Sequence, residues 1–109
     1  MSEYRQAQVY NHGRLAGTLA ENDRGYAFIY DAHYLADDTC PPISLTLLKQ
    51  EAAYESPSLF SFFDGLIPEG WVFYTVLKKW GISRKDRFGV LLVACRDCIG
   101  SVSIRRVDA

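Results

Sequence analysis

The sequence predicts one α+β domain over residues 1–109, with a mostly antiparallel sheet and about three helices packed on one face. Three observations lead to this prediction. The first 30 residues alternate between apolar and polar positions and contain turn residues, as antiparallel strands do. The middle of the chain carries apolar residues at helical spacing, and the last residues alternate again. We therefore expect an N-terminal strand meander, then helices, then a C-terminal strand.

The N-terminal meander is predicted from period-two alternation that is broken by polar and glycine-containing turns. Strands are expected at 8–10, 14–20 and 26–30, with turns at 11–13 and 21–25. The third strand places its aromatic side chains on one face of the sheet, namely Tyr26, Phe28 and Tyr30.

The segment after the meander predicts a helical turn and one further strand. Asp31 can cap a short helical turn that ends near Leu35. Residues 43–47 alternate and predict a short strand, whereas residues 49–55 are polar and are expected to be exposed.

Three helices are predicted from start signals that precede apolar residues at helical spacing. Residues 56–57 combine a hydroxyl cap with a proline at the first helical position. Residues 68–69 repeat that signal before a second helix, which should end at Gly81. The third helix follows a sequence at Ser83 that resembles a capping box.

The C-terminal elements carry clear apolar faces. The third helix has a predicted buried stripe formed by Phe88, Leu91, Leu92 and Cys95. Residues 99–107 alternate and predict the closing strand, with Val102 and Ile104 pointing inward.

Trp71 lies on the side of the second helix that should face water. The apolar stripe of this helix comprises Phe73, Val76, Leu77 and Trp80. At about 100° per residue, Trp71 falls roughly 170° from the centre of that stripe. A large aromatic side chain in this place suggests a surface that another molecule covers. Alternatively, the indole packs back over the preceding turn and closes the corner between two helices.

Charge is distributed unevenly along the chain, although the net charge is only −1. Residues 1–77 hold four basic and ten acidic side chains, whereas residues 78–106 hold eight basic and two acidic ones. The C-terminal third could therefore meet an acidic protein surface or a phosphate backbone, or both regions are simply solvated faces. The start has no signal peptide, no segment is long enough to span a membrane, and the odd count of three cysteines fits a reducing cytoplasm.

No arrangement of reactive residues predicts an enzyme, a metal site or a cofactor. Cys95 and Cys98 have the C-x-x-C spacing but follow the end of a predicted helix, where the helix dipole does not lower a thiol pKa. His12 and His33 lie in turns and lack a neighbouring nucleophile motif. Direct DNA binding through the basic third remains an alternative, with Arg84, Lys85, Arg87, Arg96, Arg105 and Arg106 as phosphate contacts. No aromatic residues interleave with these side chains, and no recognition helix is evident.

The chain resembles the N-terminal subdomain of HipA-like toxin kinases over nearly its whole length. The matching segments, in the family's order, are 9–11, 13–19, 28–30, 42–47, 62–70 and 96–102. The most specific of them is Phe62-Phe63-Asp64-Gly65-Leu66-Ile67-Pro68-Glu69-Gly70. In that family the nucleotide loop and the catalytic and metal-binding aspartates lie downstream of this subdomain. Because the chain ends after one further strand, we expect a stand-alone, HipS-like version.

This resemblance implies an antitoxin that binds and neutralises a separate HipT-like Ser/Thr kinase and has no catalytic activity of its own. A HipB-like helix-turn-helix protein would complete the complex and contact DNA, so that this chain meets DNA only indirectly. The runner-up function is a small DNA-binding repressor that uses the basic third. The expected partner-binding residues are Trp71 as anchor, with Asp64, Gly65, Pro68, Glu69, Gly70, Tyr74 and Lys78 around it.

Overall fold

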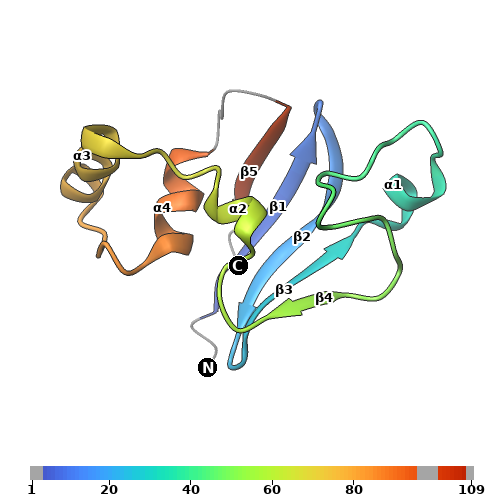
Figure 1. The fold of residues 1–109 in the computed structure, drawn as a ribbon, viewed down its shortest axis with the longest axis horizontal. Helices are drawn as coiled ribbons and strands as arrows, with labels where there is room; N and C mark the ends of the chain where they lie inside the picture. The colour runs from blue at the N-terminus through green and yellow to red at the C-terminus, as the bar shows by residue number, and fades with distance from the viewer. Residues whose placement is uncertain (1–3, 96–100, 108–109) are drawn as a thin grey trace.

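The computed structural model describes residues 4–95 and 101–107, which form a five-stranded antiparallel sheet with helices beside it (Figure 1). The strands lie in the order β4-β3-β2-β1-β5. Their bounds are β1 Gln6–Asn11, β2 Arg14–Asn22, β3 Gly25–Tyr30, β4 Tyr54–Ser56 and β5 Val102–Val107. The predicted α+β class, the meander and the closing strand are therefore confirmed. The predicted start of the last strand at 99–100 lies outside the described residues.

Four helices are present in the described part of the chain, namely α1 Ala32–Ala36, α2 Ser61–Asp64, α3 Gly70–Trp80 and α4 Arg87–Ala94. Helix α4 contacts β5, α2 and α3, and it lies between α3 and the sheet (Figure 1). Helix α3 lies at one end of the molecule, on the far side of α4 from the sheet, and its main neighbour is α4. Helix α4 therefore packs on the sheet, whereas α3, which precedes it in the chain, lies at the edge of the molecule.

The core lies between the helix-covered face of the sheet and helices α2 and α4. Strand positions alternate as predicted, so Val9, Leu19 and Ile104 are fully buried while their neighbours in the strands are not. The helices contribute fully buried rings, and Phe63 of α2 packs against Phe28 of β3 with ring centroids 5.5 Å apart. The predicted buried stripe of α4 is confirmed, because Phe88, Leu91, Leu92 and Cys95 are all at most 4% exposed.

The prediction of a strand at 43–47 is wrong. This segment makes only an isolated bridge between Ser44 and Leu47. The Tyr30 hydroxyl accepts a hydrogen bond from the Ile43 N–H and donates one to the Leu47 carbonyl. These two bonds hold both ends of the segment against one side chain, so the backbone folds into a turn instead of extending along the sheet.

The helix start predicted at 56–57 and the exposed polar segment at 49–55 are also partly wrong. Residues Tyr54–Ser56 form β4 and pair with β3, with Phe28 opposite Tyr54. The helix begins only at Ser61 and is four residues long. Edge pairing to β3 satisfies the backbone of this segment, and this gain outweighs the local signal of a serine followed by a proline.

Helix caps were predicted correctly at Asp31 and Gly81 and wrongly at Ser56 and Ser83. Asp31 caps α1 through its carboxylate, and Gly81 ends α3 with a left-handed φ of 62°. The cap of α4 is Asp86, whose carboxylate accepts the Gly89 N–H at 3.0 Å, and not Ser83. The short loop before α4 explains the shift, since Ser83 instead accepts the Lys85 N–H and forms a turn.

Candidate protein-docking site on helix α3

Helix α3 begins at a sharp change of chain direction after α2. Glu69 is its N-cap residue and makes no side-chain capping bond, and Gly70 has a φ of +66°. Pro68 is half-buried beside it, whereas Glu69 and Gly70 are exposed. The chain therefore leaves the core at Pro68 and presents the first turn of α3 to solvent.

Trp71 is the most exposed aromatic residue of the described chain, with 78% of its surface accessible. An indole that packed back over the preceding turn would be largely covered, so this fraction contradicts that alternative. Tyr74 is 57% exposed, and Lys78 is exposed as well. At helical spacing these three side chains line one side of α3, and together they form an exposed ridge.

The opposite side of α3 is less buried than predicted. None of its residues is fully buried, and Trp80, expected within the buried stripe, is 56% exposed. Phe73, Val76 and Leu77 are half-buried against the rest of the domain. Because α3 lies against α4 and not on the sheet, only a narrow strip of its surface is covered. The helix exposes apolar surface on more than one side.

Asp64 takes part in an ion pair that the sequence did not predict. Arg87 Nε donates to Asp64 Oδ1 at 2.8 Å, and Arg87 Nη2 donates to Asp64 Oδ2 at 3.1 Å. The hydrogen bonds to Asp64 raise the pKa of Arg87 above its usual value. The same guanidinium lies over the ring of Phe73, 5.4 Å from its centroid. Arg87 thereby links the end of α2, the inner side of α3 and the start of α4.

The eight predicted partner-binding residues thus separate into two groups. Glu69, Gly70, Trp71, Tyr74 and Lys78 lie on or beside the exposed ridge of α3. Asp64, Gly65 and Pro68 form the corner that precedes it, with Asp64 engaged by Arg87 and Gly65 at the C-cap of α2. Sequence reasoning named Arg87 only as a candidate phosphate contact and missed its salt bridge to Asp64, because a bond between residues 23 positions apart leaves no local signal.

A second ion-pair cluster anchors α4 to the end of the sheet. The Arg5 guanidinium donates to Glu21 at 2.8 and 3.2 Å and to Asp86 at 2.9 and 3.0 Å. Hydrogen bonds from Arg5 lower the pKa of Asp86. Burial raises the pKa of Glu21, but the hydrogen bonds and the charge of Arg5 together outweigh burial, so the pKa of Glu21 is also lowered. A side chain at Gly89 would place its Cβ 2.3 Å from Asp86 Oδ2, so the cluster requires glycine there.

In the described part of the chain, most titratable groups whose pKa is shifted take part in ion pairs. Arg14 pairs with Asp37 at 2.5 Å, and hydrogen bonds from Thr39 and Arg14 hold the pKa of Asp37 far below its usual value. Burial raises the pKa of Tyr26 and of Tyr30. Each shift has a structural partner or burial as its cause, and none singles out a proton-transfer site.

Neither the histidines nor the cysteines are gathered into a site within the described residues. His12 lies in the β1–β2 turn and His33 in α1, and both are exposed. Cys40 and Cys95 are buried, whereas Cys98 and Arg96 lie outside the described residues. Within residues 4–95 and 101–107, no group of three or more His, Cys, Asp or Glu side chains is arranged to hold a metal ion. The same residues contain no helix with the length and apolar composition needed to span a bilayer.

Comparison with known proteins identifies the family. The family model of the HipA N-terminal domain matches residues 7–105. An uncharacterized protein of Haemophilus influenzae is 31% identical over 101 residues, which cover 93% of this chain and 92% of that protein. A solved structure described as the N-terminal domain of HipA toxin superposes with a TM-score of 0.71 at 26% identity, covering 95% of this chain and 93% of that one. The chain therefore belongs to the HipA N-terminal domain family.

Proposed function

We propose that this domain is an antitoxin that binds a separate HipT-like Ser/Thr kinase and neutralises it without catalytic activity of its own. Membership of the HipA N-terminal domain family supports a toxin–antitoxin role. The family match is to this domain and not to a kinase catalytic domain, which agrees with a binding function. The observation that carries the proposal is the exposed indole of Trp71 at the start of a helix without a buried residue.

The energetics favour Trp71 as the anchor of this complex. Tryptophan is strongly enriched among the residues that dominate binding energy, and removing one from the centre of an interface typically costs about 2–4 kcal/mol. Trp71 is already exposed, so little intramolecular packing is lost when a partner covers it. Glu69, Tyr74 and Lys78 would form the polar and aromatic rim around it. Asp64, through Arg87, would hold the corner that sets the direction of the helix.

The proposed complex includes a second protein. A HipB-like helix-turn-helix protein would supply the operator contacts, and this chain would approach DNA only as part of the assembly. Such a complex would form in the cytoplasm, where operator DNA is accessible to it.

A DNA-binding repressor is the second candidate, and the basic third of the chain is the observation that favours it. Arg84, Lys85 and Arg106 are exposed, and no carboxylate in the described residues pairs with them. However, Arg87 is engaged by Asp64, and Arg105 lies over the ring of Tyr10 with its centroid 5.6 Å away. If the isolated domain bound operator DNA with an affinity that fell steeply as salt rose, this function would replace the first.

Co-expression with a neighbouring HipT-like kinase tests the proposed function. Wild-type domain should restore growth, whereas the Trp71→Ala variant should restore it poorly while remaining folded. Leu45→Ala is the matched control, because Leu45 is 89% exposed but lies outside α3. Full protection by Trp71→Ala would exclude the indole as anchor. Phosphate transfer catalysed by the purified domain alone would contradict the antitoxin proposal itself.

A further inference from the structure

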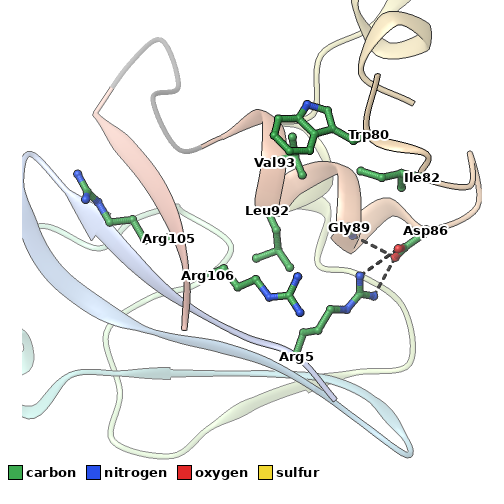
Figure 2. A pocket seen from close by; sticks show the side chains of 9 residues that line it. All are labelled: Arg5, Trp80, Ile82, Asp86, Gly89, Leu92, Val93, Arg105 and Arg106. Carbon is green, nitrogen blue, oxygen red and sulfur yellow. Dashed lines mark hydrogen bonds and ion pairs between the residues drawn. The ribbon is translucent and has the colours of Figure 1, made fainter. Parts of the chain in front are cut away.

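A groove of about 570 Å³ lies between the end of α3, helix α4 and strand β5 (Figure 2). One wall is apolar and is formed by Trp80, Ile82, Leu92 and Val93. Trp80 is 56% exposed, so part of its indole is available to a ligand in the groove. This groove is at the opposite end of α3 from Trp71, and it is separate from the surface proposed above.

The polar side of the groove offers one available cation. Arg5 already makes four hydrogen bonds to the carboxylates of Glu21 and Asp86, so its charge is compensated. Arg106 is exposed, points to the groove in Figure 2, and pairs with no carboxylate in the described residues. Arg105, the next residue of β5, lies on the other face of the sheet, over the ring of Tyr10.

Strand β5 is also an edge strand whose second half has a free hydrogen-bonding side. Ser101 O accepts the His12 N–H, so the backbones of Ser101 and of every second residue after it face β1. The backbones of Val102, Ile104 and Arg106 therefore face outward. The Ile104 N–H is taken by the Cys95 carbonyl at 2.8 Å. No hydrogen bond from the described residues reaches the N–H or C=O of Arg106, next to the groove.

We propose that the groove binds an extended acidic segment of a partner protein, which adds a strand to the free edge of β5 at Arg106. Main-chain bonds to Arg106 would supply part of the affinity, as in other cases of strand addition. A strand added to this edge directs alternate side chains to the helix-covered face. An apolar side chain would then enter against Leu92 and Ile82, and a carboxylate on the same face would pair with Arg106.

Charge complementarity selects an acidic occupant. At this end of the sheet, Arg106 in the groove and Arg105 over Tyr10 on the outer face are both solvent-exposed, and neither pairs with a carboxylate of the described residues. An acidic segment meets these cations on both of its faces, whereas a basic segment would place like charges opposite each other. The apolar wall formed by Trp80 and Leu92 favours a peptide over a fully charged polymer such as a nucleic acid.

The test is an NMR titration of the full chain with a designed probe, the acetylated and amidated peptide Ser-Glu-Glu-Leu-Glu-Val-Ser. We expect shifts at Leu92, Trp80 and Arg106, and slower hydrogen exchange of the Arg106 amide. Arg106→Glu should weaken binding at least about tenfold, whereas Arg105→Glu should weaken it less, because the Arg105 guanidinium lies over Tyr10 on the other face of the sheet. Arg106→Pro removes the outward N–H, which β1 does not use, together with the guanidinium, so it should weaken binding more than Arg106→Ala, which removes the guanidinium alone.

The controls separate this proposal from others. A probe with N-methyl leucine at its centre, or with lysines in place of glutamates, should bind more weakly than the original. Equal binding by the N-methyl probe, or shifts confined to another surface, would overturn strand addition. The proposed occupant would be wrong if an oligonucleotide bound at Arg106 and the peptide did not. It would also be wrong if light scattering showed that the domain forms a dimer through β5. Trp71→Ala should leave peptide binding unchanged, so failure here is distinguishable from failure of the antitoxin proposal.

Discussion

Helices α3 and α4 are neighbours in sequence and in space, yet they differ sharply in how much of their surface is buried. Five residues of α4 are buried, and none of α3 is. Phe88 in α4 is fully covered, whereas Trp71 in α3 is 78% exposed. Helix α4 is also anchored at both ends, by Asp86 with Arg5 at its start and by the Cys95 carbonyl with the Ile104 N–H at its end.

Under the proposed function, this difference would separate folding from recognition within one small domain. The apolar residues of α4 stabilise the domain because the sheet covers them. The exposed aromatic residues of α3, namely Trp71, Tyr74 and Trp80, contribute little to folding and leave apolar surface accessible. The predictions below test this separation, beginning with the largest expected effect.

Replacing a ring in each helix should give very different losses of stability. Phe88→Ala removes a fully buried ring that packs edge-on against Tyr26 at 5.6 Å and should cost about 3–5 kcal/mol of unfolding free energy. Trp71→Ala should change the unfolding free energy by less than about 0.5 kcal/mol, as expected for an exposed site. Urea unfolding followed by circular dichroism measures both, and comparable losses would show that α3 belongs to the core.

Arg5→Ala should destabilise the anchored helix by about 1–3 kcal/mol, since Glu21 and Asp86 lose their common donor while partly buried. Lys49→Ala is a milder control, because Lys49 donates only to the backbone carbonyls of Asp37 and Cys40. Thermal unfolding of both variants at neutral pH provides the measurement. A loss for Arg5→Ala no larger than that for Lys49→Ala would show that the cluster does not hold α4.

The same cluster should make the domain sensitive to acid. The folded-state pKa values of Asp86 and Glu21 lie below their ordinary values of 3.8 and 4.5. Their contribution to stability is therefore complete above pH 4.5 and is lost as the pH falls through the lowered values. Asp86→Asn keeps a capping oxygen for Gly89 but removes the charge, so its unfolding free energy should fall less between pH 5 and pH 2. Parallel pH profiles for wild type and variant would contradict this assignment.

Gly81→Ala should have the smallest effect on global stability and a clear local one. Gly81 adopts a left-handed φ of 62°, and a Cβ there would contact nothing within 4 Å, so strain of about 1 kcal/mol is the only cost. Because α3 has no buried residue, this cost should appear as faster hydrogen exchange in α3, with little change in the melting temperature of the domain. Faster exchange throughout α4 would show that the two helices unfold together.

The sequence was sufficient to predict the elements whose patterns are local. The meander, the cap at Asp31, the end of α3 at Gly81 and the inward face of β5 follow from alternation, turn residues and helical spacing. The exposed position of Trp71 also followed, because helical spacing fixes its angle relative to the apolar stripe.

Contacts between distant residues were not predictable in this way. The turn at 43–47 depends on the Tyr30 hydroxyl, and β4 depends on pairing with β3. The salt bridge between Arg87 and Asp64 joins residues far apart in the chain, so no periodic pattern in the sequence predicts it. The exposure of Trp80 depends on α3 lying against α4 and not on the sheet, a choice that amphipathic spacing alone does not determine.

The most direct test of the central claim is the affinity of the domain for a purified HipT-like kinase, measured by calorimetry. Trp71→Ala should weaken binding roughly 30- to 1000-fold, the equivalent of about 2–4 kcal/mol, while Leu45→Ala leaves it unchanged. Equal affinities for wild type and Trp71→Ala, with both proteins folded, would contradict the claim that the exposed indole of α3 anchors this domain to its partner.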